Sequence, residues 1–111
     1  MRVWYHVKDI DAGRAFYTQH LGFSETYHDR EGRWSRLVRD GMEIALAEGP
    51  LQDGGTAMVD VEDVKGEAER LRELGVQVGV VVELHGQMRI LDVFDPDGNR
   101  LQLAQELHSS Q

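Results

Sequence analysis

The chain has 111 residues, of which 41% are hydrophobic, and 20 acidic against 12 basic side chains give a net charge of −8. This charge would repel a phosphate backbone, so nucleic acid is not expected as a partner. The absence of cysteine excludes disulfides and thiolate chemistry, and no apolar run approaches the roughly 18 residues of a membrane span. The chain opens directly on a strand-like pattern without a signal peptide, so we expect a cytoplasmic protein with no membrane partner.

Three segments of the first half of the chain return in the same order in the second half. VKDI at 7–10 returns as VEDV at 61–64, and LGF at 21–23 returns as LGV at 74–76. DGMEIALA at 40–47 returns as DGNRLQLA at 97–104. Repeats in register indicate equivalent structural units. The sequence therefore predicts one domain over residues 1–111, made of a first module at about 2–48, a linker at 49–55 and a second module at about 56–105.

The first module begins with an alternating strand at 2–7. Asp9 or Asp11 is suited to cap a helix that runs through Leu21, with Ala12, Ala15 and Phe16 among its apolar positions. Glycine at 22 is in the place where a left-handed residue ends a helix. Three strands are expected to follow, at 24–29, 33–39 and 42–47.

The second module has the same pattern. A strand starts at about residue 56, and Asp63 precedes a helix with Ala68, Leu71 and Leu74 on its apolar face. Strands are expected at 78–84, 88–94 and 100–104. Asp40-Gly41 and His85-Gly86 suit tight hairpin turns between strands. The order is βαβββ twice, which is an α+β fold.

Alternation along the strands separates two faces of each predicted sheet. Val3, Tyr5 and Val7 should pack under the helix, so that their neighbours face the other side. A mixed apolar and polar face of this kind is typical of a small-molecule pocket. The expected ligand-binding residues share this outer face, and they are Arg2, Trp4, His6, Glu43, Thr56, Met58, Asp60 and Gln102.

Three motifs carry a family resemblance: VKDI at 7–10, FY through LGF at 16–23, and DPDGN at 95–99. With them the chain resembles the vicinal oxygen chelate superfamily, which includes glyoxalase I, bleomycin-resistance proteins and extradiol dioxygenases. The resemblance covers nearly the whole chain. It implies two βαβββ modules that form an open, barrel-like sheet around a cavity (the glyoxalase/bleomycin resistance fold), and commonly a homodimer.

Metal-using members of that superfamily place a histidine at the start of a module's first strand and a glutamate in its last strand. The matching positions here are Arg2 and Thr56 for the first strands, and Ala45 and Gln102 for the last strands. Arginine cannot coordinate a cation, alanine offers no ligand, and neutral oxygens bind transition metals weakly. We therefore expect no metal and no cofactor. His6 and Glu43 remain as substitute ligands on the same face, and His85 lies where it could reach a pocket mouth.

Three functions stay open at this stage. The first is a metal-free protein that binds and sequesters an antibiotic or aromatic metabolite, with Trp4, Trp34 and Tyr27 as stacking surfaces. The second is a metal-dependent lyase or dioxygenase resembling glyoxalase I. The third is a metal-free enzyme with His6 as base and Arg2 as anion anchor. The sequence does not name the ligand, nor does it say whether the cavity lies within one chain or between two.

Overall fold

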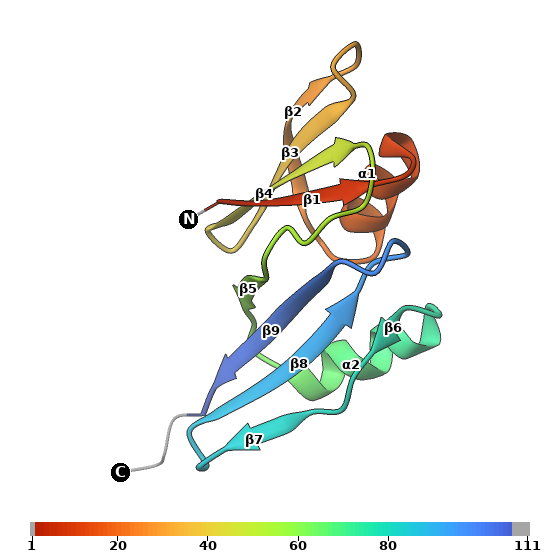
Figure 1. Cartoon of the computed structure of the whole chain (residues 1–111). Coiled ribbons are helices and arrows are strands. Elements are labelled where there is room, and N and C mark those ends of the chain that lie inside the picture. Colours follow the sequence, from red (N-terminus) through yellow and green to blue (C-terminus); the bar gives the residue numbers. More distant parts are fainter. Residues whose placement is uncertain (1, 108–111) are drawn as a thin grey trace.

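The computed structural model describes residues 2–107, and for Arg2 the backbone alone is described. It shows an α+β fold in which two sheets lie side by side and each carries one helix on one face (Figure 1). The elements of the first half are β1 (Arg2–Val7), α1 (Ile10–Gln19), β2 (Ser24–Asp29), β3 (Trp34–Arg39) and β4 (Met42–Glu48). Those of the second half are β5 (Ala57–Asp60), α2 (Val64–Glu73), β6 (Gln77–Val78), β7 (Val82–Leu84), β8 (Met88–Phe94) and β9 (Arg100–Glu106).

The two sheets have the same topology, which confirms the predicted paired βαβββ fold. The first has the strand order β1-β4-β3-β2 and the second β5-β9-β8-β6, with β7 also paired to β8. The first strand of each half runs parallel to its last strand, and the other pairs are antiparallel. The sheets stay open and separate, and they do not close into a barrel (Figure 1).

Aspartates begin both helices as predicted, whereas α1 ends at Gln19, before the predicted Leu21. The Asp9 side chain accepts hydrogen bonds from the backbone nitrogens of Asp11 and Ala12, and Asp63 caps α2 in the same way through the nitrogen of Gly66. Beyond the helices, Gly22 and Gly75 have φ angles of 72° and 80°. Because only glycine adopts this region without strain, the chain turns away from each helix at these residues.

The buried faces of the helices match the prediction in part, since Ala68 and Leu71 of α2 are buried as predicted. In α1 the buried residues are Ile10, Gly13 and Tyr17, whereas Ala12 is exposed. Gly13 allows a close approach to β1, since a Cβ atom there would lie 3.3 Å from a methyl group of Val7. In α2 the predicted core residue Leu74 follows the last turn and is 46% exposed.

The strand expected at 78–84 is divided into β6 and β7, so the prediction of one continuous strand was wrong. Both pieces pair with β8, at its opposite ends. The hairpin that follows has His85 and Gly86 at φ angles of 53° and 66°, as a type I′ turn requires. His85 is therefore an exposed residue at a hairpin tip.

A buried polar network joins the two halves. The Tyr17 hydroxyl of α1 donates to the Asp95 carboxylate at 2.8 Å, and the Asn99 amide donates to the backbone oxygen of His6 at 2.9 Å. Tyr5 of β1 accepts a hydrogen bond from the backbone nitrogen of Ala57 and donates to the carbonyl of Arg100. The DPDGN loop thus holds the second half against β1 and α1.

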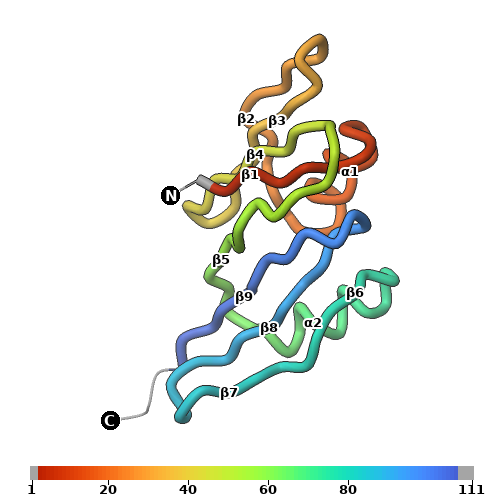
Figure 2. Tube along the Cα trace, viewed as in Figure 1, coloured from red at the N-terminus to blue at the C-terminus, as the bar shows by residue number. Residues whose placement is uncertain are grey.

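Between the halves, the linker runs from the end of β4 past β1 to β5 (Figure 2). A Cβ atom at Gly54 would lie 1.7 Å from the backbone oxygen of Trp4, so only glycine fits against this strand. The resulting molecule is elongated, with extents of 53 × 26 × 23 Å. Within residues 2–107, neither helix is long and apolar enough to cross a bilayer.

Candidate functional site

Three aromatic rings gather on the outer face of the first sheet, the face opposite α1. The Trp4 and Trp34 ring centroids are 5.9 Å apart, and those of Trp34 and Tyr27 are 5.1 Å apart. Trp4 is 41% exposed and Tyr27 is 47% exposed, although both are large apolar side chains. We call Trp4, Trp34 and Tyr27 the aromatic cluster. Such rings bury much area and stack on planar partners, so the cluster can act as a binding surface.

Strand register brings these rings together. Val3, Tyr5 and Val7 are nearly inaccessible under α1, which confirms the predicted strand faces and directs Trp4 to the outer side. In the sheet Trp4 pairs with Ala45, and Trp34 pairs with Ala47. The cluster is therefore built across β1, β3 and the neighbouring β2, with small alanines on β4 between them.

Arg36 lies within the cluster, and the sequence reasoning did not select it. Its guanidinium carbon is 5.7 Å from the centroids of both Tyr27 and Trp34, within the range of a cation–π contact. Alternation along β3 places Trp34 and Arg36 on the same face as Ala45 and Ala47. This period-two signal was present in the sequence, but its meaning depends on knowing which strand lies beside β3.

The other predicted residues of β1 and β4 whose side chains are described, His6 and Glu43, lie on this face, where His6 pairs with Ala47. The His6 Nε2 atom meets the amide of Gln52 in the linker at 3.3 Å, while its Nδ1 atom is buried without a hydrogen-bond partner. Glu43 is half-buried and pairs in the sheet with Arg2 and Val38. His6 is therefore held against the linker, while Arg2 is placed here only by its backbone.

Of the predicted residues of the second half, Met58, Asp60 and Gln102 lie on the second sheet, whereas Thr56 precedes β5. Thr56 borders a hollow of about 540 Å³ against the linker, where its hydroxyl accepts a hydrogen bond from Arg100. Gln102 donates to Asp92 at 2.9 Å, and both border an apolar hollow of about 190 Å³ beside Val82. Met58 pairs directly with Gln102 and is 44% exposed.

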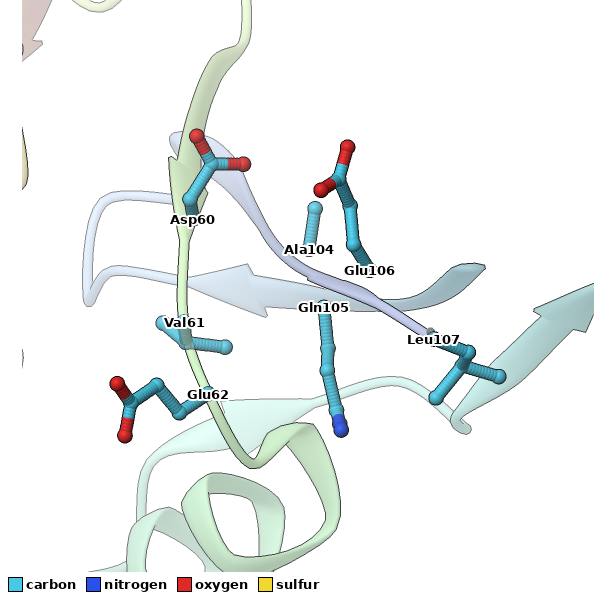
Figure 3. Close-up of a pocket in the computed structure, with 7 residues that line it drawn as sticks. All are labelled: Asp60, Val61, Glu62, Ala104, Gln105, Glu106 and Leu107. Atoms are coloured by element: carbon cyan, nitrogen blue, oxygen red, sulfur yellow. The ribbon is translucent and has the colours of Figure 1, made fainter. Parts of the chain in front are cut away.

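Asp60 lies at a third hollow, of about 660 Å³, at the end of β5 and β9. In Figure 3 the carboxylates of Asp60 and Glu106 point to the same side as Ala104, whereas Gln105 points to the helix on the other side. Gln105 accepts a hydrogen bond there from the first backbone nitrogen of α2. The structure thus separates Trp4, His6 and Glu43 on the first sheet from Met58, Asp60 and Gln102 on the second.

The side chains at the superfamily's metal positions do not fit a metal ion. Ala45 offers no donor and is 1% exposed between its sheet neighbours Trp4 and Arg36. Gln102 already donates its amide to Asp92, and Thr56 offers a neutral hydroxyl. Among the described residues, no group of three or more histidine and carboxylate side chains is placed to hold a metal.

The fold and the outer face define a class: a paired βαβββ protein that presents aromatic and polar side chains on open sheets. The model of the Glyoxalase/Bleomycin resistance protein/Dioxygenase superfamily matches residues 2–103. The chain belongs to this superfamily, which confirms the resemblance seen in its motifs. A search of curated protein sequences found no match.

Solved structures support the same fold assignment. An integron cassette protein from the mobile metagenome of a Halifax Harbour sewage outfall is 27% identical, with a TM-score of 0.82, over 95% of this chain and 96% of that one. The bleomycin resistance determinant of transposon Tn5 is 21% identical, with a TM-score of 0.75, over 96% of both chains. The antibiotic-binding protein TnmS3 from a Streptomyces species is 24% identical, with a TM-score of 0.75, over 95% of this chain and 93% of that one.

Proposed function

We propose that this chain is a cytoplasmic, metal-free protein that binds and sequesters a planar small molecule, either an antibiotic or an aromatic metabolite. The observation that carries the proposal is the aromatic cluster, in which two large rings stay open to solvent on a sheet face. An indole and a phenol exposed in this way offer flat apolar area with two rotatable side-chain bonds each, which is the usual composition of a surface that holds a planar ligand.

The names of two proteins with the same fold support the proposal that the chain binds an antibiotic or a similar small molecule. One is a bleomycin resistance determinant and the other an antibiotic-binding protein. The side chains at the metal positions, Ala45 above all, weigh against the alternative of a metal-dependent lyase or dioxygenase. The contact of His6 with Gln52 gives no support to the third alternative, in which His6 acts as a base beside Arg2.

A thermal-shift screen against antibiotics, aromatic metabolites and divalent metals tests the proposal. We expect planar aromatic compounds to raise the melting temperature, because a ligand that binds only the native state stabilises it. Both tryptophans of the chain belong to the cluster, so true ligands should also change the tryptophan emission.

Elemental analysis of protein purified without chelator should find no stoichiometric metal. One tightly held metal ion per chain, or stabilisation by metals alone, would contradict the proposal.

We further propose that the site is completed by a second copy of the chain. Residues of the outer face lie on two sheets of an elongated molecule, and the second sheet exposes an apolar edge. Val80 is 74% exposed, Val82 46% and Leu84 41%, around the hollow that Gln102 and Asp92 border. Contiguous exposed apolar groups of this kind mark interaction sites. In the proposed homodimer, the first sheet of one protomer faces the second sheet of its partner across a shared cavity.

Light scattering checks the dimer. We expect about 25 kDa in solution, twice the 12.6 kDa of the chain, as for a two-fold dimer. Leu84→Glu should shift the protein to the monomer, because it places a charge in the apolar contact. The matched control is Leu74→Glu, since Leu74 is similarly exposed but follows α2. A wild-type monomer at micromolar concentration, or equal effects of both variants, would refute this arrangement.

A further inference from the structure

The Arg36 side chain is positioned by the rings around it. Its guanidinium carbon lies 5.7 Å from the ring centres of Tyr27 and Trp34, while its backbone pairs with Tyr27 on one side and Ala45 on the other. Contacts with two ring faces limit the motion of a long side chain. The cation is thus fixed in the sheet face where the proposed ligand binds.

The hydrogen-bonding capacity of this guanidinium is unused by the described part of the chain. Its Nε atom is buried and has no hydrogen-bond partner, and Arg36 makes no ion pair with a described residue. A guanidinium presents five N–H donors in a planar fork and accepts none. The buried Nε atom is out of a ligand's reach, but the terminal nitrogens are not buried and have no acceptor among the described residues, so they can donate to an acidic group of a ligand.

The spacing between Arg36 and Trp4 limits the shape of such a ligand. Both residues pair with Ala45, Arg36 from β3 and Trp4 from β1. They are therefore two strand spacings apart on one face, which is about 10 Å. A ring system of two fused rings that stacks on Trp4 covers most of this span and can direct a substituent at Arg36.

We propose that Arg36 anchors an anionic oxygen of the ligand, so that the ligand class is a planar aromatic compound carrying a carboxylate or a similar acidic group. This inference rests on the proposed function and assigns the charge of its ligand. The net charge of −8 would by itself favour a cationic ligand. A hydrogen bond with Arg36 affects ligand preference more than the net charge does. Distant surface charges are screened over about 8 Å at physiological salt, whereas a direct charge-assisted hydrogen bond is not.

Three probes with the same ring and different charge test the assignment. They are naphthalene-2-carboxylate, naphthalene-2-carboxamide and 2-naphthylmethylammonium, titrated by calorimetry into the 111-residue protein. We expect the carboxylate to bind about tenfold more tightly than the ammonium, since hydrogen bonds to charged groups contribute about that much. Equal affinities, or a preference for the ammonium, would overturn the inference.

Variants separate this inference from the proposed function. Arg36→Gln should weaken the carboxylate about tenfold and change the carboxamide little, while Arg36→Lys should recover part of the loss, because lysine keeps the charge but not the planar fork. The control Arg70→Gln makes the same change of charge on the exposed face of α2 and should have no effect. Thermal unfolding confirms that each variant is folded. If all three probes bind and Arg36→Gln changes none, the inference alone fails; if none binds, the proposed function fails as well.

Discussion

Trp4→Ala is expected to weaken the binding of a planar aromatic ligand about tenfold or more, because an aromatic stacking surface contributes roughly 1–3 kcal/mol. Trp4 is 41% exposed beside Trp34, so its ring is available to a ligand. The variant should remain folded, since β1 is held by its buried residues on the opposite face. The aromatic compound that raises the melting temperature most in the screen should be titrated by calorimetry into both proteins.

Two controls sharpen this test. Leu74→Ala removes an apolar side chain of similar exposure (46%) beyond the end of α2, and it should leave binding unchanged. Trp4→Phe keeps a smaller ring and should give an intermediate loss. A dissociation constant for Trp4→Ala within about twofold of the wild type, a difference below 1 kcal/mol, would place the ligand elsewhere.

Asp95→Ala is expected to lower the free energy of unfolding by about 3 kcal/mol or more. Asp95 is 4% exposed and accepts hydrogen bonds from the Tyr17 hydroxyl, the Asn99 side chain, and the backbone nitrogens of Asp97 and Asn99. Its removal leaves buried donors without partners, at about 1–3 kcal/mol each. Urea unfolding followed by circular dichroism measures the loss.

Tyr17→Phe is the matched comparison, because it removes one donor and leaves the carboxylate with the others. We expect a loss of about 1 kcal/mol. Burial raises the pKa of Asp95 above its ordinary 3.8, although the hydrogen bonds from Asn99 and Tyr17 oppose the change, and burial also raises the pKa of Tyr17. A loss in Asp95→Ala no larger than that in Tyr17→Phe would show that the bonds of Asp95 within its own loop add nothing to the bond with Tyr17.

Most of the fold could be predicted from short segments. Alternation identified the buried face of β1, the capping aspartates 9 and 63 marked the helix starts, and positive φ angles at Gly22 and Gly75 ended the helices. These signals succeed because strand pleating, helix capping and left-handed backbone conformations depend on a few adjacent residues. The internal repeat then predicted the same order of elements for the second module.

The errors concern the packing of α1, the end of α2 and one divided strand. The buried face of α1 includes Gly13 because β1 comes close there, and Leu74 is exposed because α2 ends before it. The strand expected at 78–84 divides where the register of its pairing with β8 shifts, between the pairs Val78↔Val93 and Val82↔Ile90. The division of the strand depends on pairing with β8, and the burial of Gly13 depends on packing against β1, neither of which the pattern of the segment itself shows.

For the candidate site, the sequence by itself determined which side chains leave each strand on the outer face, since side chains alternate with a period of two. Only the tertiary structure decided which of them meet. It placed Arg36 between Tyr27 and Trp34, and Trp4 beside Trp34, through the register of four strands. It also placed Met58, Asp60 and Gln102 on a second sheet, at the other end of an elongated molecule. Pairing between strands is a long-range property, so no local pattern along β3 could identify its neighbours.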